Sequence, residues 1–182
     1  MSNCSLRLLQ EIDATLVARL VGPPPGPHNF FRGGPLETYD AETRKAIATV
    51  QGMINAELAT QVLETALGAI WHGGPVWVHG DVAAGNLLLR GGRLAAVIDF
   101  GCSGVGDPAC DLVIAWTVSL RAGREAFRVA LPLDARTWAR GRGWALWKAL
   151  ITFAGNLQAD QAAAATARPV IDEVLDEHVH TV

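Results

Sequence analysis

Apolar residues recur at three- and four-residue spacing along two stretches of the N-terminal half, which is the spacing of one helical face. In residues 5–21 this face consists of Leu6, Leu9, Ile12, Leu16 and Leu20. After Asp40, which is suited to cap a helix, it consists of Ala46, Ile47, Val50, Met53, Ile54, Leu58, Val62, Leu63 and Leu67. The pattern predicts an amphipathic helix over 5–21 and a second helical stretch from Asp40 that breaks near Gly52 and ends by 73–75.

Proline and glycine dominate the segment between these two stretches. Residues 22–27 read Gly-Pro-Pro-Pro-Gly-Pro. Because proline lacks the amide donor and moves the residue before it out of the helical region, this run cannot continue a helix. We expect a loop from Gly22 to about Pro35.

Between residues 75 and 100 the pattern changes from helical to β-prone. Val76-Trp77-Val78 is a short run with high strand propensity. Two apolar runs, 87–89 and 94–98, flank Gly91-Gly92. A Gly-Gly pair between two such runs is typical of a β-hairpin with a two-residue turn.

The C-terminal part of the chain returns to helical patterns. Asp107 before Pro108 places a capping residue ahead of a proline at the first helical position, so a helix should run to roughly Leu120. Further helices are expected at about 137–156, 159–167 and 169–180. The prediction is a single α-rich α+β domain, with segments 1–35 (helix and proline-rich loop), 36–74 (helical), 75–106 (β element) and 107–182 (helical).

The composition supports one hydrophobic core and argues against several classes of function. Half of the 182 residues are apolar, and 15 basic against 18 acidic residues leave no broad basic surface for nucleic acid. Apolar runs end well before the ~20 residues that a membrane span needs, and Glu11 and Asp13 interrupt the N-terminal leucines, unlike a signal peptide. The three cysteines show no Cys-x-x-Cys spacing, so we expect a reducing cytoplasm and neither a disulfide framework nor a thiolate zinc site.

Two short polar motifs flank the predicted hairpin. Residues 79–86 read His-Gly-Asp-Val-Ala-Ala-Gly-Asn, and the second strand leads into Asp99-Phe100-Gly101. With the turn at Gly91-Gly92, Asn86 lies opposite Val97. Because opposed residues share a face and side chains alternate with period two, Asn86 and Asp99 are then diagonal neighbours that point the same way.

These side chains have the chemistry of a phosphoryl-transfer site. Diagonal neighbours lie ~7–8 Å apart, so the Asn86 amide oxygen and the Asp99 carboxylate could converge on one hard cation. Asp81 lies on the loop that leads into the same end of the hairpin. Its carboxylate could orient a hydroxyl and accept its proton. Taken singly, each residue is more typical of a turn, a strand cap or a loop start. Their joint order, Asp, four residues, Asn, then Asp-Phe-Gly, is the pattern of kinase catalytic sites.

The chain resembles the aminoglycoside phosphotransferase family over three runs of residues. These are 79–86, Val97-Ile98-Asp99-Phe100-Gly101, and Gly106-Asp107-Pro108-Ala109-Cys110-Asp111-Leu112. The likeness is most specific from Val76 to Trp116, and the flanking helices fit the C-terminal lobe of the family. The family includes macrolide, homoserine, choline and fructosamine kinases. The resemblance therefore implies a protein-kinase-like C-terminal lobe, a helical domain with a small catalytic hairpin.

The resemblance also implies roles for individual residues. Asp81 would be the catalytic base with His79 in a supporting part, and Asp111 would brace the loop. Asn86 and Asp99 would hold Mg²⁺ against the phosphates of the nucleotide, ATP or alternatively GTP. The implied activity is transfer of the ATP γ-phosphoryl group to a hydroxyl of a small, cationic, aminoglycoside-like acceptor.

One part of the family pattern is missing from this sequence. Full members have an N-terminal lobe of strands, with a phosphate-covering loop and a lysine that contacts the phosphates. The lysines here, Lys45 and Lys148, fall in helical patterns, and the glycines of 101–106 follow the metal ligand out of Gly-x-Gly-x-x-Gly order. The N-terminal lobe is therefore expected to be absent.

Three explanations for this absence are open: a fragment of a longer enzyme, one half of a two-chain enzyme, or a degenerate remnant. The alternative function is a catalytically idle lobe that binds a small molecule or a protein. An isolated lobe leaves apolar surface uncovered near its hinge, so we expect a homo-oligomer or a partner that supplies the missing lobe, with the 5–21 helix as one candidate contact.

Two further groups of residues have both a structural and a functional interpretation. An acidic run near the C-terminus is either a solvated helix face or a set of contacts to acceptor ammonium groups. Its members are Asp172, Glu173, Asp176 and Glu177. Trp138, Trp144 and Trp147 share one helical stretch, which favours core packing over a ligand-stacking platform. For the run from Phe30 to Arg32, packing over the lobe is likewise favoured over lining a substrate mouth.

Overall fold

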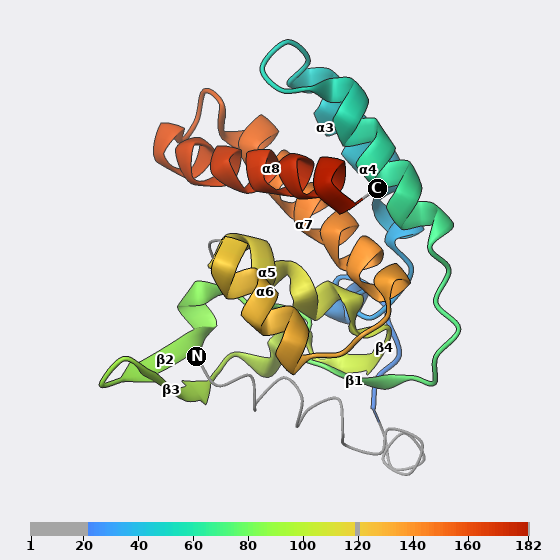
Figure 1. Cartoon of the computed structure of the whole chain (residues 1–182), viewed down its shortest axis with the longest axis vertical. Coiled ribbons are helices and arrows are strands. Elements are labelled where there is room, and N and C mark those ends of the chain that lie inside the picture. Colours follow the sequence, from blue (N-terminus) through green and yellow to red (C-terminus); the bar gives the residue numbers. More distant parts are fainter. Residues whose placement is uncertain (1–21, 119–120, 182) are drawn as a thin grey trace.

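The computed structural model describes residues 22–118 and 121–181, and the fold is mostly helical with two small antiparallel sheets (Figure 1). The α-helices are α3 (Asp40–Thr49), α4 (Ala56–Gly68), α5 (Ile114–Thr117), α6 (Arg121–Ala130), α7 (Ala135–Asn156) and α8 (Gln161–Thr181). The strands are β1 (Val76–Val78), β2 (Leu87–Arg90), β3 (Arg93–Val97) and β4 (Gly104–Gly106). Short 3₁₀ helices are η1 (Pro27–Asn29), η2 (Leu36–Tyr39), η3 (Ala84–Asn86), η4 (Phe100–Cys102) and η5 (Pro108–Val113).

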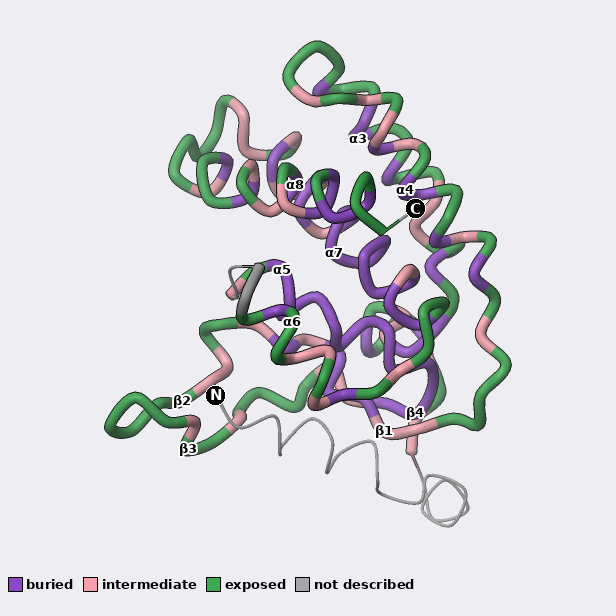
Figure 2. The backbone as a smooth tube through the Cα atoms, viewed as in Figure 1, coloured by how far each residue is buried: buried purple, intermediate pink, exposed green. Residues whose placement is uncertain are grey.

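Helix α7 is the centre of the hydrophobic core. It packs against α3, α4, α8 and η5. Burial is concentrated along α7, whereas the β2–β3 hairpin is largely exposed (Figure 2). Trp138, Trp144 and Trp147 are all buried, which confirms the prediction that these aromatic side chains pack in the core.

Two of the strands bring distant parts of the chain together. Strand β1 pairs with β4, with Val78 opposite Gly104, although the two strands are separated by the whole hairpin. The loop that follows β1 therefore begins beside η5, which follows β4. The sequence predicted β1 but not β4.

The β2–β3 hairpin has the predicted turn but not the predicted register. Gly91 and Gly92 both have positive φ, as a tight two-residue turn requires. Arg90 pairs with Arg93, but a bulge then shifts the pairing so that Leu87, rather than Asn86, lies opposite Val97. The predicted register was therefore wrong beyond the first two pairs, because the apolar runs do not alternate and so specify the register weakly.

Several helix boundaries also differ from the prediction. The N-cap of α3 is Tyr39 rather than Asp40, although the break at Gly52, where φ is +84°, is confirmed. The helix predicted after Asp107 is mainly the 3₁₀ helix η5, and α6 was not predicted. The helix predicted over residues 5–21 lies outside the described residues.

Two predicted C-terminal helices are in fact one, because α8 continues through Pro169. A proline removes only one hydrogen bond of the helical ladder. Buried residues on both sides of it, Ala164, Ala167, Ile171 and Val174, belong to the common core, so packing holds the two parts in line. None of the helices in the described ranges is long and apolar enough to span a bilayer.

Candidate active site

A carboxylate from η5 anchors the start of the 79–86 loop. Asp111 is fully buried, and its two oxygens accept hydrogen bonds from the backbone N–H groups of His79 and Gly80, each at 2.8 Å. Burial raises the pKa of Asp111 to about 6, although both donors favour the ionised form. These bonds fix the start of the loop relative to η5.

The buried ring of His79 joins this loop to the end of the hairpin. Its Nδ1 accepts a hydrogen bond from the Asp81 N–H at 3.3 Å, so the ring proton is on Nε2. Nε2 then donates to the carbonyl oxygen of Ile98 at 2.9 Å. The ring also lies 4.6 Å from the ring of Phe100. His79 therefore holds the backbone directly before Asp99.

Asp81 presents a partly exposed carboxylate at the centre of the site. Its Oδ1 accepts a hydrogen bond from Lys148 Nζ at 2.6 Å, and its side chain is 34% exposed. Partial burial raises the pKa of Asp81, but the hydrogen bond and charge of Lys148 and the charge of Arg32 outweigh it, so the pKa lies below its usual range. Asp81 is thus ionised at neutral pH and can accept a proton.

Asn86 is oriented by Asp81. Its Nδ2 donates to the Asp81 carbonyl oxygen at 2.9 Å and lies 3.5 Å from the Asp81 carboxylate. This fixes which way the amide faces. No donor among the described residues hydrogen-bonds to Oδ1, so this oxygen is available as a ligand.

Asp99 lies next to Asn86 in a left-handed conformation. Its φ is +61°, and its Oδ1 accepts a long hydrogen bond from the Gly101 N–H at 3.4 Å. Short polar residues tolerate this conformation better than others. The residue before it, Ile98, donates its N–H to the Asn86 carbonyl oxygen at 2.9 Å. Asn86 is therefore level with Ile98 rather than Val97, yet it remains a neighbour of Asp99.

The donor atoms at this end of the hairpin suit a hard divalent cation such as Mg²⁺. The Asn86 amide oxygen and the exposed Asp99 carboxylate are the oxygen ligands that Mg²⁺ prefers. In the described part of the chain no group of three or more His, Cys, Asp or Glu side chains could hold a metal ion. Two protein ligands are nevertheless sufficient for Mg²⁺, which takes its other ligands from water and substrate phosphates.

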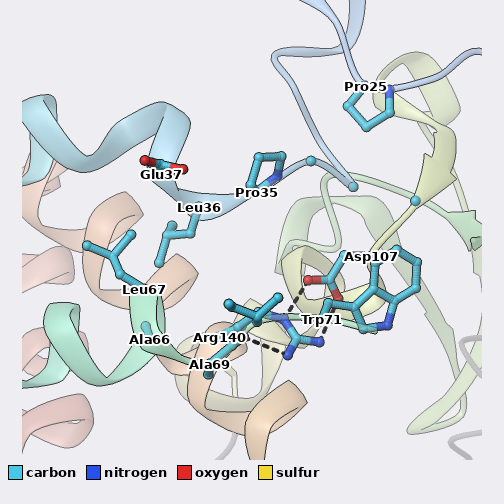
Figure 3. A pocket seen from close by; sticks show the side chains of 14 residues that line it. Pro25, Pro35, Leu36, Glu37, Ala66, Leu67, Ala69, Trp71, Asp107 and Arg140 are labelled. Atoms are coloured by element: carbon cyan, nitrogen blue, oxygen red, sulfur yellow. Dashed lines mark hydrogen bonds and ion pairs between the residues drawn. The ribbon is translucent and has the colours of Figure 1, made fainter. Parts of the chain in front are cut away.

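A separate cavity of about 550 Å³ lies outside the 79–86 loop, between α4, η2 and the Pro25 segment (Figure 3). Apolar side chains line most of it, including Leu36, Leu67 and Trp71. At one side Arg140 forms a bidentate pair with Asp107, at 2.6 and 3.1 Å, and donates to the Ala69 carbonyl oxygen. No residue of the 79–86 loop lines this cavity, so it is distinct from the site around Asp81.

The four acidic residues of α8 are already engaged with basic side chains. Asp172 pairs with Arg168, Glu173 with Arg124, and Asp176 with His180. Glu177 is buried among Arg124, Arg128 and Arg142 and accepts a hydrogen bond from Trp116. The structure therefore brings together His79, Asp81, Asn86, Asp99 and Asp111, but not the acidic residues of α8.

Two basic residues of the site were not predicted from the sequence. Lys148 was noted only as a lysine within a helix, and Arg32 was expected to pack over the lobe. Both reach Asp81 electrostatically from elements far away in the sequence. The available signal was that Lys148 is one of only two lysines in the chain, and no pattern relates its position to that of Asp81.

A protein-family model matches most of the chain. Residues 6–144 match the profile of the phosphotransferase enzyme family, abbreviated APH. No curated protein sequence is similar enough to match the chain.

The similar solved structures include two aminoglycoside phosphotransferases, both at low sequence identity. One is a thermostable mutant of aminoglycoside phosphotransferase APH(4)-Ia in the apo form, with 19% identity and a TM-score of 0.44 over 76% of this chain. The other is the streptomycin–ATP–APH(2″)-IIa ternary complex, with 19% identity and a TM-score of 0.46 over 96% of this chain. The chain covers 53% of the first and 59% of the second, so it spans little more than half the length of either.

Proposed function

Because the chain belongs to the phosphotransferase enzyme family, we propose that it supplies the catalytic lobe of a small-molecule kinase that transfers the γ-phosphoryl group of ATP to a hydroxyl group. The lobe corresponds to the C-terminal, helical lobe of the kinase-like fold and comprises residues 1–182 as one domain. The observation that carries the proposal is the arrangement of Asp81 and Asn86. The Asn86 amide faces Asp81 with its nitrogen, which leaves its oxygen for a cation.

Asp81 is the base in this proposal. The acceptor hydroxyl would lie against the Asp81 carboxylate, its oxygen would attack the γ-phosphorus, and its proton would pass to Asp81 as the bond to ADP breaks. The Lys148 hydrogen bond holds the carboxylate in one orientation. His79 and Asp111 keep the loop backbone in place without contacting the reacting atoms.

Asn86 and Asp99 would hold Mg²⁺ together with the nucleotide phosphates. When bound, the cation would neutralise phosphate charge that develops during the transfer. ATP as the nucleotide, with GTP as the alternative, and the cytoplasm as the location are part of the same proposal. The cationic acceptor expected from the α8 carboxylates has less support, because those side chains are paired with arginines and a histidine.

Calorimetry of Mg²⁺-dependent ATP binding tests the site in this chain. We expect binding that is lost in Asp99→Ala, because the carboxylate that holds the cation is removed. Asp81→Asn should keep nucleotide binding but reduce the rate of transfer to a hydroxyl acceptor by about 10²–10⁴-fold. Full turnover in Asp81→Asn would show that another group is the base.

A catalytically idle binding lobe is the second candidate, and the Lys148–Asp81 ion pair favours it. This contact occupies one oxygen of the proposed base in the absence of ligands. Formation of phosphorylated product by the chain alone would exclude the idle lobe. Under either candidate we propose that a second copy or a separate chain completes the assembly, which sedimentation over a range of concentrations would detect.

A further inference from the structure

Arg32 lies beside the proposed base in a fixed orientation. Its guanidinium carbon is 4.7 Å from the ring centre of Trp147 and 5.2 Å from that of Trp144. Trp147 is itself held by Glu42, which accepts a hydrogen bond from its Nε1 at 2.7 Å. A guanidinium that rests on indole faces keeps its plane, so its N–H donors form a preorganised fork for a carboxylate or phosphate.

Within the described ranges, no hydrogen bond or ion pair joins the Arg32 guanidinium to another residue, and its Nε is buried without a partner. The hydrogen bonds that Arg32 does make, with Asn29, use its backbone N–H and carbonyl oxygen. Arg142 also has a buried Nε without a partner, but its guanidinium, like those of Arg124 and Arg140, reaches a carboxylate, whereas that of Arg32 reaches none among the described residues. A buried donor without an acceptor is costly, and an oxygen atom of a ligand would satisfy it.

Lys148 adds a second positive charge next to Asp81. Its side chain is 37% exposed, and its ammonium group lies 2.6 Å from the Asp81 carboxylate. Arg32 also lies close to the loop, because a Cβ added at Gly80 would lie 3.0 Å from the Cβ of Arg32. Both positive charges act on Asp81, the residue that would receive the proton of the acceptor hydroxyl.

We propose that Arg32 and Lys148 form an oxyanion-binding site beside Asp81 that takes phosphate or carboxylate oxygens. This inference rests on the proposed function, since the ligand would be part of the transfer reaction. The anion has two possible sources: the phosphoryl group during its transfer, or an anionic group of the acceptor itself. Both would place negative oxygens against the Arg32 fork and draw Lys148 away from Asp81.

Titration of the full chain with inorganic phosphate, followed by tryptophan fluorescence and calorimetry, tests the site. Phosphate should bind without Mg²⁺ or nucleotide, and Arg32→Met and Lys148→Met should each weaken binding at least about tenfold. Arg32→Lys should restore only part of the affinity, because it keeps the charge and loses the planar fork. Arg136→Met, at an exposed arginine of α7, is the matched control and should bind as the unchanged protein does.

Asp81→Asn separates an anion site from a structural contact. Removal of the competing carboxylate releases Lys148, so this variant should bind phosphate more tightly than the unchanged chain, whereas a purely structural Lys148 would leave the affinity unaltered. The inference is overturned if phosphate does not bind, or if the Arg32 and Lys148 variants, folded by near-ultraviolet circular dichroism, bind it as the unchanged protein does.

Competition identifies the source of the anion. If Mg²⁺ and a non-hydrolysable ATP analogue displace phosphate, the site receives the transferred phosphoryl group. If phosphate stays bound and D-glycerate displaces it while glycerol does not, the site receives an anionic group of the acceptor. If the unchanged chain binds Mg²⁺ and nucleotide but not phosphate, this inference alone is overturned. If it binds phosphate but not Mg²⁺ and nucleotide, the proposed function is contradicted and the anion site remains.

Discussion

Gly80 is the residue at which the backbone of the 79–86 loop leaves no room for a side chain. Its φ is +82°, and a Cβ there would overlap the carbonyl oxygen of Cys102. Glycine alone adopts this conformation without steric cost. The loop can therefore approach η4 and keep both N–H bonds to Asp111 only with glycine at this position.

Gly80→Ala should destabilise the protein by at least about 2 kcal/mol, because both the backbone conformation and the contact with Cys102 become strained. Gly85→Ala is the matched control in the same loop, since a Cβ there would meet nothing within 4 Å. Urea unfolding of both variants measures the difference. Equal stability of the two variants would contradict the close approach at Gly80.

Asp111 should give the stability of the protein a distinctive pH dependence. Its pKa is raised to about 6 in the folded protein by burial, so the folded state binds the proton more tightly than the unfolded state does. Its contribution to the free energy of unfolding is therefore most favourable below the unfolded pKa and is lost as pH rises to about 6. The total change is about 3 kcal/mol.

The measurement is the difference in unfolding free energy between the unchanged protein and Asp111→Asn from pH 4 to 7.5. This difference should fall as pH rises and level off above pH 7. Asp134→Asn is the control: burial raises the pKa of Asp134, but the Thr137 hydrogen bonds outweigh it and lower the pKa, so its contribution is lost only as pH falls below the usual value of 3.8 and the difference should stay nearly level over this pH range. A pH-independent difference for Asp111→Asn would contradict the raised pKa.

At the scale of elements, the sequence predicted the hairpin and its turn but not its pairing. Glycines at 91 and 92 identify the turn because few residues tolerate positive φ. The runs on either side, Leu-Leu-Leu and Leu-Ala-Ala-Val-Ile, have no alternation to distinguish one register from the next. The bulge is fixed instead by contacts outside the hairpin, from Asn86 and His79 to Ile98. Those contacts become visible only in three dimensions.

The Asp107–Arg140 pair connects η5, α7 and the end of α4. Both residues are 5% exposed, and Asp107 also accepts the Ala109 N–H at the start of η5. The cap of η5 was predicted from Asp107 before Pro108, which are adjacent in sequence. The arginine was not, because 33 residues separate it from its partner.

Arg140→Met should lower the free energy of unfolding by about 3–5 kcal/mol, because it leaves the Asp107 carboxylate buried without its partner. Arg136→Met removes an exposed arginine from the same helix and should change it by less than about 0.5 kcal/mol. Thermal and urea unfolding of the two variants make the comparison. Methionine keeps most of the aliphatic part of the arginine side chain. If both variants lost similarly little stability, packing of that aliphatic part, rather than the ion pair with Asp107, would account for the contribution of Arg140.

For the molecule as a whole, short-range motifs of the site were predictable and long-range partners were not. The spacing from His79 to Asn86 and the Asp-Phe-Gly run identified the candidate base and cation ligands, which lie close along the chain. Lys148 reaches Asp81 from 67 residues away. Packing of α7 at the centre of the core determines that contact, and no periodicity in the sequence encodes it.

Glu177 also makes contacts between parts of the chain that are distant in sequence, since it joins four helices. Its carboxylate meets Trp116 of α5, Arg124 and Arg128 of α6, and Arg142 of α7. Arg124 is 2% exposed and Arg142 6% exposed, so neither can turn to water when the carboxylate is lost. The acidic run of α8 therefore contains at least one residue whose main contribution is to hold the helices together.

Glu177→Gln should lower the free energy of unfolding by about 3 kcal/mol, because it leaves the buried Arg142 guanidinium without a counter-charge. Glu173→Gln is the matched control: it lies one turn earlier on α8 and pairs with the same Arg124, but its side chain is 39% exposed. The control should lose less than about 1 kcal/mol, as exposed ion pairs do. If both variants lost the same amount in urea unfolding, burial would not be what distinguishes Glu177. Unaltered stability of Glu177→Gln would mean instead that water reaches the arginines and that the four helices are held by apolar packing alone.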